Sequence, residues 1–217
     1  MRAVVVAGGE LTPSDAALLD GADLMVAADG GAAALDALGG TPHLLVGDLD
    51  SIKPAAVARL EAGGTRVERH PSAKDASDAE LAIDRAAAAG ADRIDVVGAL
   101  GGPRFDHELA TLLLLADPAW SGRDLRIVRG GVTVRALHAG ERVELDGRAG
   151  DLVSLLPVGG DAAGVHTQGL RWPLDGETLR MGRSRGLSNE VAEVPAAVQL
   201  ASGTLLVIET AAGGSRP

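Results

Sequence analysis

The chain has 217 residues, of which 46% are hydrophobic and 23% charged, values typical of a globular protein with one large or two small domains. Its formal net charge of −10 argues against a nucleic-acid partner, which would require a basic surface. The absence of cysteine excludes disulfides, thiolate zinc sites and cysteine nucleophiles. Because no apolar run suits a signal peptide or a membrane span, we expect a cytoplasmic protein without a membrane partner.

The first half alternates short apolar runs with helical patterns, the order expected for a parallel α/β sheet. Buried strands are predicted at residues 3–7, 24–28, 43–46 and 93–97. Helices are predicted at residues 14–20, 31–38, 54–62, 77–89 and 106–116. The last helix has an apolar stripe formed by Leu109, Leu112, Leu113 and Ala116.

From about Asp124 onward the sequence becomes a series of short segments rich in β-branched residues, separated by Gly, Pro and Asp. Strands are predicted at residues 125–128, 132–137, 142–145, 152–156, 191–194, 197–201 and 204–209. We therefore predict an N-terminal Rossmann-like α/β domain, residues 1–123, and a C-terminal β-sandwich domain, residues 124–217. Residues 211–217 are expected to form a frayed tail.

Three acidic motifs stand at or just after the predicted strand ends of the first half. They contain Asp29, then Asp48 and Asp50, then Asp75 and Asp78. Ligands of open parallel sheets bind outside the carboxyl ends of the strands, and carboxylates gathered there repel one another unless a cation shares them. Magnesium is the natural candidate, because it prefers oxygen ligands and bridges carboxylates to phosphates.

Each acidic motif also has a purely structural interpretation. Asp-Gly and Gly-Asp pairs form turns, and any single motif is a simple turn rather than a metal site at odds of about two to one. Ser77 and Glu80 fit a capping box, and Asp106 could be a helix N-cap. The clustering of the motifs, rather than any one of them, favours a metal site.

The predicted strand at 93–97 is followed by Gly98-Ala-Leu-Gly101-Gly102-Pro-Arg104-Phe-Asp106-His107 at a helix start. Glycines allow close approach of the backbone to an anion, and the helix N-terminus offers free amides. Arg104 can add a bidentate contact to phosphate oxygens. No P-loop and no Gly-x-Gly-x-x-Gly turn is present, so an ordinary nucleotide-binding motif is not expected.

With these residues identified, the sequence resembles the thiamine pyrophosphokinase family over nearly its whole length. The motifs that carry the resemblance occur in order: Ala28-Asp-Gly-Gly31, Gly47-Asp-Leu-Asp-Ser-Ile52, Lys74-Asp-Ala-Ser-Asp78, Gly98 to His107, Gln168-Gly-Leu-Arg-Trp-Pro-Leu174 and Ser184-Arg-Gly-Leu-Ser-Asn-Glu190. The chain departs from the family's usual pattern at Leu49, Ala76 and Pro103. The family joins a catalytic α/β domain to a β-sandwich, the same division that the sequence periodicity predicts.

The resemblance implies roles for particular residues of the first half. Asp48, Asp50 and Asp78 fall where the family holds Mg²⁺ and the triphosphate, and Asp29 falls in the same acidic cleft. The residues implied in ATP binding are Lys74, Asp75, Ser77, Gly101, Gly102, Arg104 and Asp106.

In the second half, the resemblance places Trp172 against the rings of thiamine and Ser188 and Asn189 at its pyrimidine. A tryptophan without context is more often a packing residue, by about three to one. A cationic thiazolium over an indole face would gain about 0.5–2 kcal/mol. Family members are homodimers whose thiamine pocket uses both subunits, so the resemblance also implies a homodimer.

The implied reaction is attack of the primary alcohol of thiamine on the β-phosphorus of ATP, with Mg²⁺ as cofactor and AMP as the leaving group. Which aspartate accepts the alcohol proton stays open. Two alternatives also stay open: a diphosphate transfer to another hydroxymethyl heterocycle, such as a pterin, and a non-catalytic sensor of nucleotide or thiamine diphosphate.

Overall fold

The structure is a computed structural model that describes residues 1–213, and its chain divides into two compact units. The first unit comprises Met1–Thr111 with Ile127–Arg129, and the second Leu112–Arg126 with the chain from Gly130 onward. The end of the predicted tail, residues 214–217, lies outside the described residues. Ala211 and Ala212 are not frayed, because their backbone amides donate to Gly131 O at 2.9 Å and to Asp151 Oδ1 at 2.8 Å.

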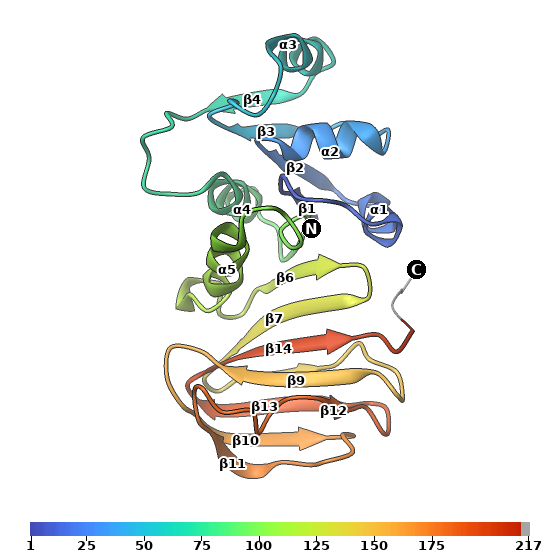
Figure 1. Cartoon of the computed structure of the whole chain (residues 1–217), viewed down its shortest axis with the longest axis vertical. Coiled ribbons are helices and arrows are strands. Elements are labelled where there is room, and N and C mark those ends of the chain that lie inside the picture. Colours follow the sequence, from blue (N-terminus) through green and yellow to red (C-terminus); the bar gives the residue numbers. More distant parts are fainter. Residues whose placement is uncertain (214–217) are drawn as a thin grey trace. The chain divides into compact units, whose positions relative to one another are not determined.

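The N-terminal unit contains a parallel sheet in which β1, β2, β3 and β4 lie in this order (Figure 1), with β5 on the other side of β1. Its strands are β1 (Arg2–Val6), β2 (Leu24–Ala28), β3 (Leu44–Gly47), β4 (Arg66–Arg69) and β5 (Arg93–Val97). Residues 3–6 of β1 have no exposed surface. A strand that is apolar on both faces must be covered on both, which accounts for its unbroken apolar run.

Helices join these strands and supply the cover. They are α1 (Pro13–Leu19), α2 (Gly31–Ala37), α3 (Pro54–Ala62), α4 (Asp78–Ala88) and α5 (Phe105–Leu114). Leu35 of α2 packs with Val4 and Val6 of β1, whereas α4 lies against β1, β2, β3 and β5. None of the described helices is long and apolar enough to cross a bilayer.

Local capping explains where several helices begin. Thr12 and Asp15 form a reciprocal capping box at α1, and Pro54 opens α3. At α4 one half of the predicted capping box forms: the Ser77 hydroxyl accepts a hydrogen bond from Glu80 N at 3.1 Å.

One strand of this unit was not predicted. The sequence of β4, Arg-Val-Glu-Arg, carries one apolar residue and so gives no strand signal. The apolar stripe of α5 lies partly at the surface: Leu109 and Leu113 are 42% and 47% exposed, and Thr111 is the buried residue of the helix.

The C-terminal unit is a sandwich of two antiparallel sheets, with orders β12-β9-β14-β7 and β11-β10-β13-β8. Its strands are β7 (Val132–His138), β8 (Arg142–Glu144), β9 (Leu152–Pro157), β10 (Ala162–Gln168), β11 (Asp175–Leu179), β12 (Asn189–Glu190), β13 (Ala197–Ser202) and β14 (Thr204–Thr210). A short 3₁₀ helix (Pro118–Trp120) and β6 (Asp124–Arg129) precede them, and the last three residues of β6 belong to the N-terminal unit. The α/β-plus-sandwich fold class predicted from the sequence is confirmed.

The core of the sandwich is aliphatic and draws on both sheets. Val153, Leu155 and Val207 of one sheet pack with Val165 and Leu200 of the other. Strands β10 and β11 were not predicted, because polar and glycine residues interrupt their apolar pattern. The strand predicted at 191–194 is wrong: Val191 makes a single bridge to Leu170, and Val194 is exposed.

The C-terminal unit also contains a network of charged side chains in which Arg126, Arg135 and Glu209 are buried. Arg135 Nη2 donates to Glu209 Oε1 at 2.6 Å and to Asp146 Oδ2 at 2.9 Å. The second oxygen of Glu209, a residue with 2% of its surface exposed, accepts from Gly147 N at 2.8 Å. Arg126 pairs with Asp146 from the other side. Glu209, the buried carboxylate of the network, therefore has a cationic and an amide partner, whereas Asp146 is half exposed.

Candidate active site

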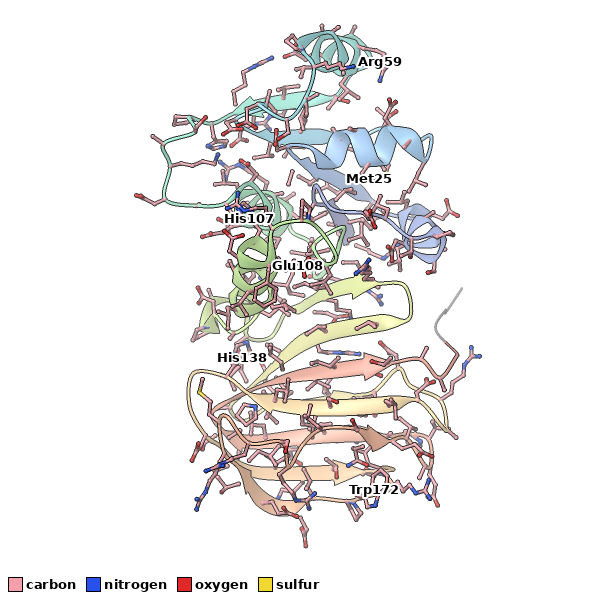
Figure 2. All side chains as sticks on the ribbon, viewed as in Figure 1. Met25, Arg59, His107, Glu108, His138 and Trp172 are labelled. Atoms are coloured by element: carbon pink, nitrogen blue, oxygen red, sulfur yellow. The ribbon has the colours of Figure 1, made fainter. Side chains whose placement is uncertain are left out.

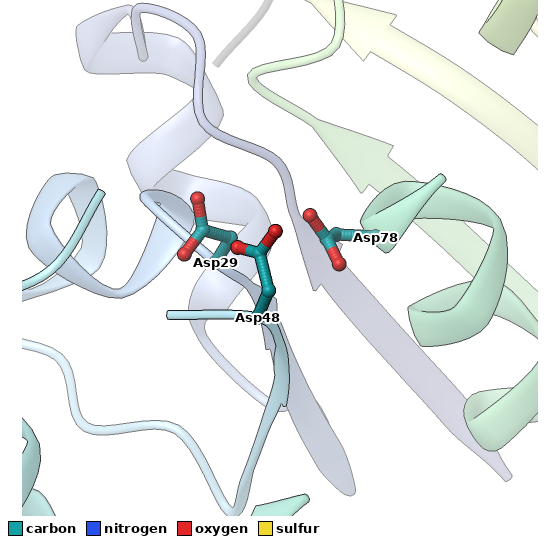
Figure 3. A group of neighbouring side chains, drawn as sticks. All are labelled: Asp29, Asp48 and Asp78. Carbon is teal, nitrogen blue, oxygen red and sulfur yellow. The ribbon is translucent and has the colours of Figure 1, made fainter. Parts of the chain in front are cut away.

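Three carboxylates meet at the carboxyl edge of the parallel sheet. Asp29 follows β2, Asp48 follows β3, and Asp78 is the first residue of α4. One oxygen from each lies within 4.8 Å of the others, and Figure 3 shows the three side chains pointing toward a common space. The structure thus gathers carboxylates from positions up to 49 residues apart in the sequence (Asp29 to Asp78).

The backbone at this edge is shaped to bring the carboxylates together. Asp29 has a positive φ of 43°, and its amide donates to Val46 O at 2.8 Å. Gly47 has φ 149°, and a Cβ atom there would lie 3.1 Å from Asp29 Cβ and 3.2 Å from Asp78 Oδ1. Position 47 therefore needs glycine both for its conformation and for space.

A single lysine lies against the group. Lys74 Nζ is 2.9 Å from Asp78 Oδ1 and 3.9 Å from Asp48 Oδ2. The 2.9 Å approach is an ion pair rather than a well-directed hydrogen bond, since Asp78 Oδ1 has no hydrogen-bond partner of good geometry. The contact with Asp78 raises the pKa of Lys74. The neighbouring Ser72 hydroxyl and the Asp50 amide lower the pKa of Asp48, so this side chain is ionised at neutral pH.

The donor set suits a hard divalent cation. Asp29 Oδ1 is buried and has no hydrogen-bond partner among the described residues, a costly arrangement unless a cation shares the oxygen. Carboxylate oxygens are ligands that Mg²⁺ prefers, and three of them are gathered here. Asp50, which the sequence placed in the metal set, lies outside this group: it is exposed, and its Oδ1 accepts from the Ser51 hydroxyl at 2.9 Å.

The carboxylates line one side of a cavity of about 700 Å³ within the N-terminal unit. Of the predicted site residues, those that line it are Asp29, Asp48, Lys74, Ser77, Asp78, Gly102, Arg104 and Asp106. The cavity therefore joins the acidic motifs to the glycine turn after β5. Asp75 and Gly101 do not line it.

Arg104 and Asp106 form a bidentate ion pair at the cavity, with contacts of 2.9 Å (Nε–Oδ1) and 2.6 Å (Nη2–Oδ2). Arg104 lowers the pKa of Asp106 to about 2. Both side chains are exposed, so the pair can open toward a ligand. Asp106 is not the helix N-cap, since α5 begins one residue earlier at Phe105.

Gly101 instead accommodates an arginine. It has φ 81°, and a Cβ atom there would lie 2.1 Å from the guanidinium carbon of Arg129. The positive φ is what favours glycine here, since the tip of a flexible arginine could move aside.

Sequence reasoning missed several cavity residues. Gly8 and Gly9 follow β1 and line the cavity, and Gly9 N donates to Gly98 O at 2.8 Å, so two glycine turns lie side by side. Their position after a buried apolar run was a usable signal. The other missed residues with polar side chains are Ser51, Ser72, His107, Glu108 and Thr111. Figure 2 labels His107 and Glu108 on α5.

Trp172 belongs to the C-terminal unit, where its side chain is 50% exposed (Figure 2). The buried amide of Asn189 holds its backbone: Trp172 N donates to Asn189 Oδ1 at 3.1 Å, and Asn189 Nδ2 donates to Trp172 O at 2.7 Å. The Arg171 guanidinium lies 5.3 Å from the indole centroid. Ser188 adopts φ 56°, and its amide donates to Ser154 Oγ. Asn189 therefore fixes the backbone of Trp172, and half of the tryptophan surface is accessible to a ligand or partner.

The grouped carboxylates offer ligands for a metal ion, and the two glycine turns at the same edge allow phosphates to approach the backbone, features suited to a phosphate-group transferase. Two family models match the chain: "Thiamin pyrophosphokinase, catalytic domain" over residues 16–128 and "Thiamin pyrophosphokinase, vitamin B1 binding domain" over residues 142–205. The chain belongs to the thiamine pyrophosphokinase family, which confirms the resemblance found in the sequence.

Individual relatives agree with this assignment. The chain is 27% identical to the thiamine pyrophosphokinase of Bacillus subtilis (strain 168), over 95% of this chain and 97% of the relative. The crystal structure of a Bacillus subtilis thiamine pyrophosphokinase superposes with a TM-score of 0.85 at 26% identity, covering 97% of this chain and 99% of the other. The crystal structure of the thiamin pyrophosphokinase from Geobacillus thermodenitrificans superposes with a TM-score of 0.82 at 28% identity, with both chains fully covered.

Proposed function

We propose that the protein transfers the diphosphate group of ATP to thiamine, giving thiamine diphosphate and AMP. The observation that carries the proposal is the group of Asp29, Asp48 and Asp78 in a cavity that also contains Lys74 and Arg104. Such a cavity combines ligands for a divalent cation with two cations for phosphate oxygens. The relatives that cover almost the whole chain are thiamine pyrophosphokinases.

The three carboxylates are proposed to hold Mg²⁺, with Asp50 as a further acidic group at the edge of the site. When bound, the ion would neutralise charge on the phosphate oxygens during transfer. Asp48 is ionised at neutral pH and so is ready to act as a ligand or as a base. The chain's own part is to gather the carboxylates through the backbone of Asp29 and Gly47.

The glycine turns and the basic residues would position ATP. Gly8, Gly9 and Gly102 allow the phosphates to approach the backbone closely, and Lys74 and Arg104 are within the same cavity. Arg104 would exchange its contact with Asp106 for phosphate oxygens. Ser77 and Asp75 lie on the segment that precedes α4 and would contact the phosphate end of the nucleotide.

In the reaction, the hydroxyl oxygen of thiamine forms a bond to the β-phosphorus of ATP as the bond from that phosphorus to the α–β bridging oxygen breaks. The hydroxyl proton passes to a carboxylate of the group, and AMP leaves with the bridging oxygen. A primary alcohol is a poor nucleophile, so the rate depends on alignment and on charge stabilisation rather than on a covalent intermediate.

Thiamine is proposed to bind against the half-exposed indole of Trp172, with Ser188 beside it and Asn189 fixing the tryptophan backbone. We further propose a homodimer in which a partner subunit completes this pocket. The exposed indole supports the proposal, because a large aromatic surface at a binding site is ordinarily covered by ligand or partner.

Incubation of the protein with thiamine, ATP and Mg²⁺, followed by chromatography of nucleotides and thiamine esters, tests the reaction. Equal amounts of AMP and thiamine diphosphate are expected, with neither formed by the Asp48→Asn variant. ADP with thiamine monophosphate would contradict the two-phosphate transfer. Turnover only with a hydroxymethyl pterin would replace the acceptor, and binding without turnover would favour the sensor alternative.

A further inference from the structure

Lys74 stands out among the basic residues of the chain. The sequence contains two lysines, Lys53 and Lys74, among 20 basic residues, and the other 18 are arginines. Lys74 is 14% exposed and lies against the acidic group, whereas Lys53 is exposed at the start of α3. Lys74 thus lies beside carboxylates, where a compact ammonium on a flexible stem and a planar guanidinium would bind differently.

The acidic group needs a positive charge even before a metal ion binds. Its three carboxylates lie within 4.8 Å of one another, and the ion pairs to Asp48 and Asp78 among the described residues both come from Lys74. Asp29 also contributes to the field that Lys74 experiences. Without this ammonium the carboxylates would repel one another, since Arg104, the other cavity cation, is paired with Asp106.

From this geometry we propose that Lys74 is the internal counter-ion of the metal-free site, and that a divalent cation displaces its ammonium group from Asp48 and Asp78. This inference rests on the proposed function, because the displaced ammonium would then be free to contact the phosphates of ATP. Lys74 is therefore a positioning residue that keeps the carboxylates gathered until the metal binds.

The surrounding chain permits such a movement without a change of fold. The segment that carries Lys74 is held at both ends: His70 N donates to Gly47 O at 2.9 Å, and Ser77 caps α4. The ammonium contacts one oxygen of Asp78 at 2.9 Å and lies 3.9 Å from Asp48 Oδ2. Rotation about the four-carbon stem would move the charge, whereas a guanidinium would grip a carboxylate with two bonds.

Lysine-selective ¹³Cε labelling tests the displacement directly, because the two lysines give two side-chain signals. Mg²⁺ is titrated into the nucleotide-free protein, and the Lys74→Arg variant assigns the signals. The Lys74 signal is expected to shift with Mg²⁺ saturation while the Lys53 signal stays fixed. A Lys74 signal that does not move while Mn²⁺ binding is detected by electron paramagnetic resonance would overturn the proposal, as would a complete absence of Mn²⁺ binding.

Two matched variants give a second readout. Lys74→Met is expected to lower the melting temperature in EDTA and to recover it with Mg²⁺, whereas Lys53→Met should change neither. Since a neighbouring charge alters proton affinity by about 10- to 1000-fold, Lys74→Met should bind Mn²⁺ at least about tenfold more tightly without nucleotide. Unchanged or weaker Mn²⁺ binding would overturn the proposal.

The lysine shift and the product analysis are independent measurements. A protein that shows the shift but makes no thiamine diphosphate keeps the counter-ion role and loses the proposed reaction. A protein that makes thiamine diphosphate without the shift keeps the reaction and loses the counter-ion role.

Discussion

The two units of the molecule use acidic side chains in opposite ways. In the C-terminal unit Glu209 is buried, and both of its oxygens accept hydrogen bonds from Arg135 and Gly147. In the N-terminal unit Asp29 leaves a buried oxygen without a hydrogen bond among the described residues. A fully partnered carboxylate stabilises a fold, whereas one without a partner retains the capacity to bind a ligand. The difference separates structural from functional acids more clearly than burial does.

The largest expected effect comes from removing a carboxylate of the acidic group. Asp48→Asn should lower kcat/KM by about 10³-fold or more, because metal-assisted charge stabilisation is worth several kcal/mol. The melting temperature should stay unchanged or rise, since repulsion is relieved. Steady-state kinetics with thermal unfolding measures both.

Asp50→Asn is the matched control for that variant, because Asp50 lies on the same turn but outside the group. Its loss of activity should be clearly smaller than that of Asp48→Asn. Equal losses would return Asp50 to the metal set that the sequence motif suggested.

Breaking the network around Glu209 should instead lower the free energy of unfolding. Arg135→Met leaves Glu209 charged and without its cation, which costs about 3–5 kcal/mol of unfolding free energy. Arg142→Met, which breaks the exposed pair with Glu144, should cost about 0–1 kcal/mol. Urea denaturation of the two variants makes the comparison, and equal values would refute the structural role of the network.

An intermediate effect is expected at Glu68, a paired acid of the N-terminal unit. Arg85 holds Glu68 through two donors and lowers its pKa from 4.5 to about 2. Because the folded pKa is depressed, this stabilisation is present above about pH 4.5 and is lost as the pH falls toward 2. Glu68→Gln should cost about 1.5–3 kcal/mol at pH 7 and flatten the pH dependence of stability across that window. An unchanged acid limb would contradict the assignment.

The smallest effect is expected at Trp172. Losing a cation–π contact of about 0.5–2 kcal/mol should raise the KM for thiamine about 2- to 30-fold in Trp172→Ala, with the KM for ATP unchanged. Trp172→Phe should recover part of the loss, because it restores an aromatic face. A change in the KM for ATP alone would place the indole elsewhere in the reaction.

The sequence predicted most where one local pattern decides the structure. Buried apolar runs located β2 and β5, and Pro54 with Gly63 bounded α3. It missed β4, β10 and β11, whose polar or glycine-containing sequences become strands through their neighbours in the sheet. The apolar stripe of α5 did not reveal which face is buried, because an apolar residue is not obliged to be buried.

Within the site, the motifs identified the carboxylates but not their grouping. Asp48 and Asp50 look equivalent in Gly-Asp-Leu-Asp-Ser, and only the positive φ of Leu49 and the path of the chain separate them. The pairing of Arg135 with Glu209 joins residues 74 positions apart and leaves no local signal. The hydrogen bonds of Asn189 to the Trp172 backbone, 17 positions away, likewise had no local signal.

A crystal structure of the protein grown with Mn²⁺ tests the central claim most directly, because the anomalous signal locates the ion. We expect a peak bound by carboxylate oxygens of Asp29, Asp48 and Asp78, with Lys74 moved away from them. A peak at Asp50 instead, or an acidic group that binds no ion while Lys74 remains in place, would contradict the account.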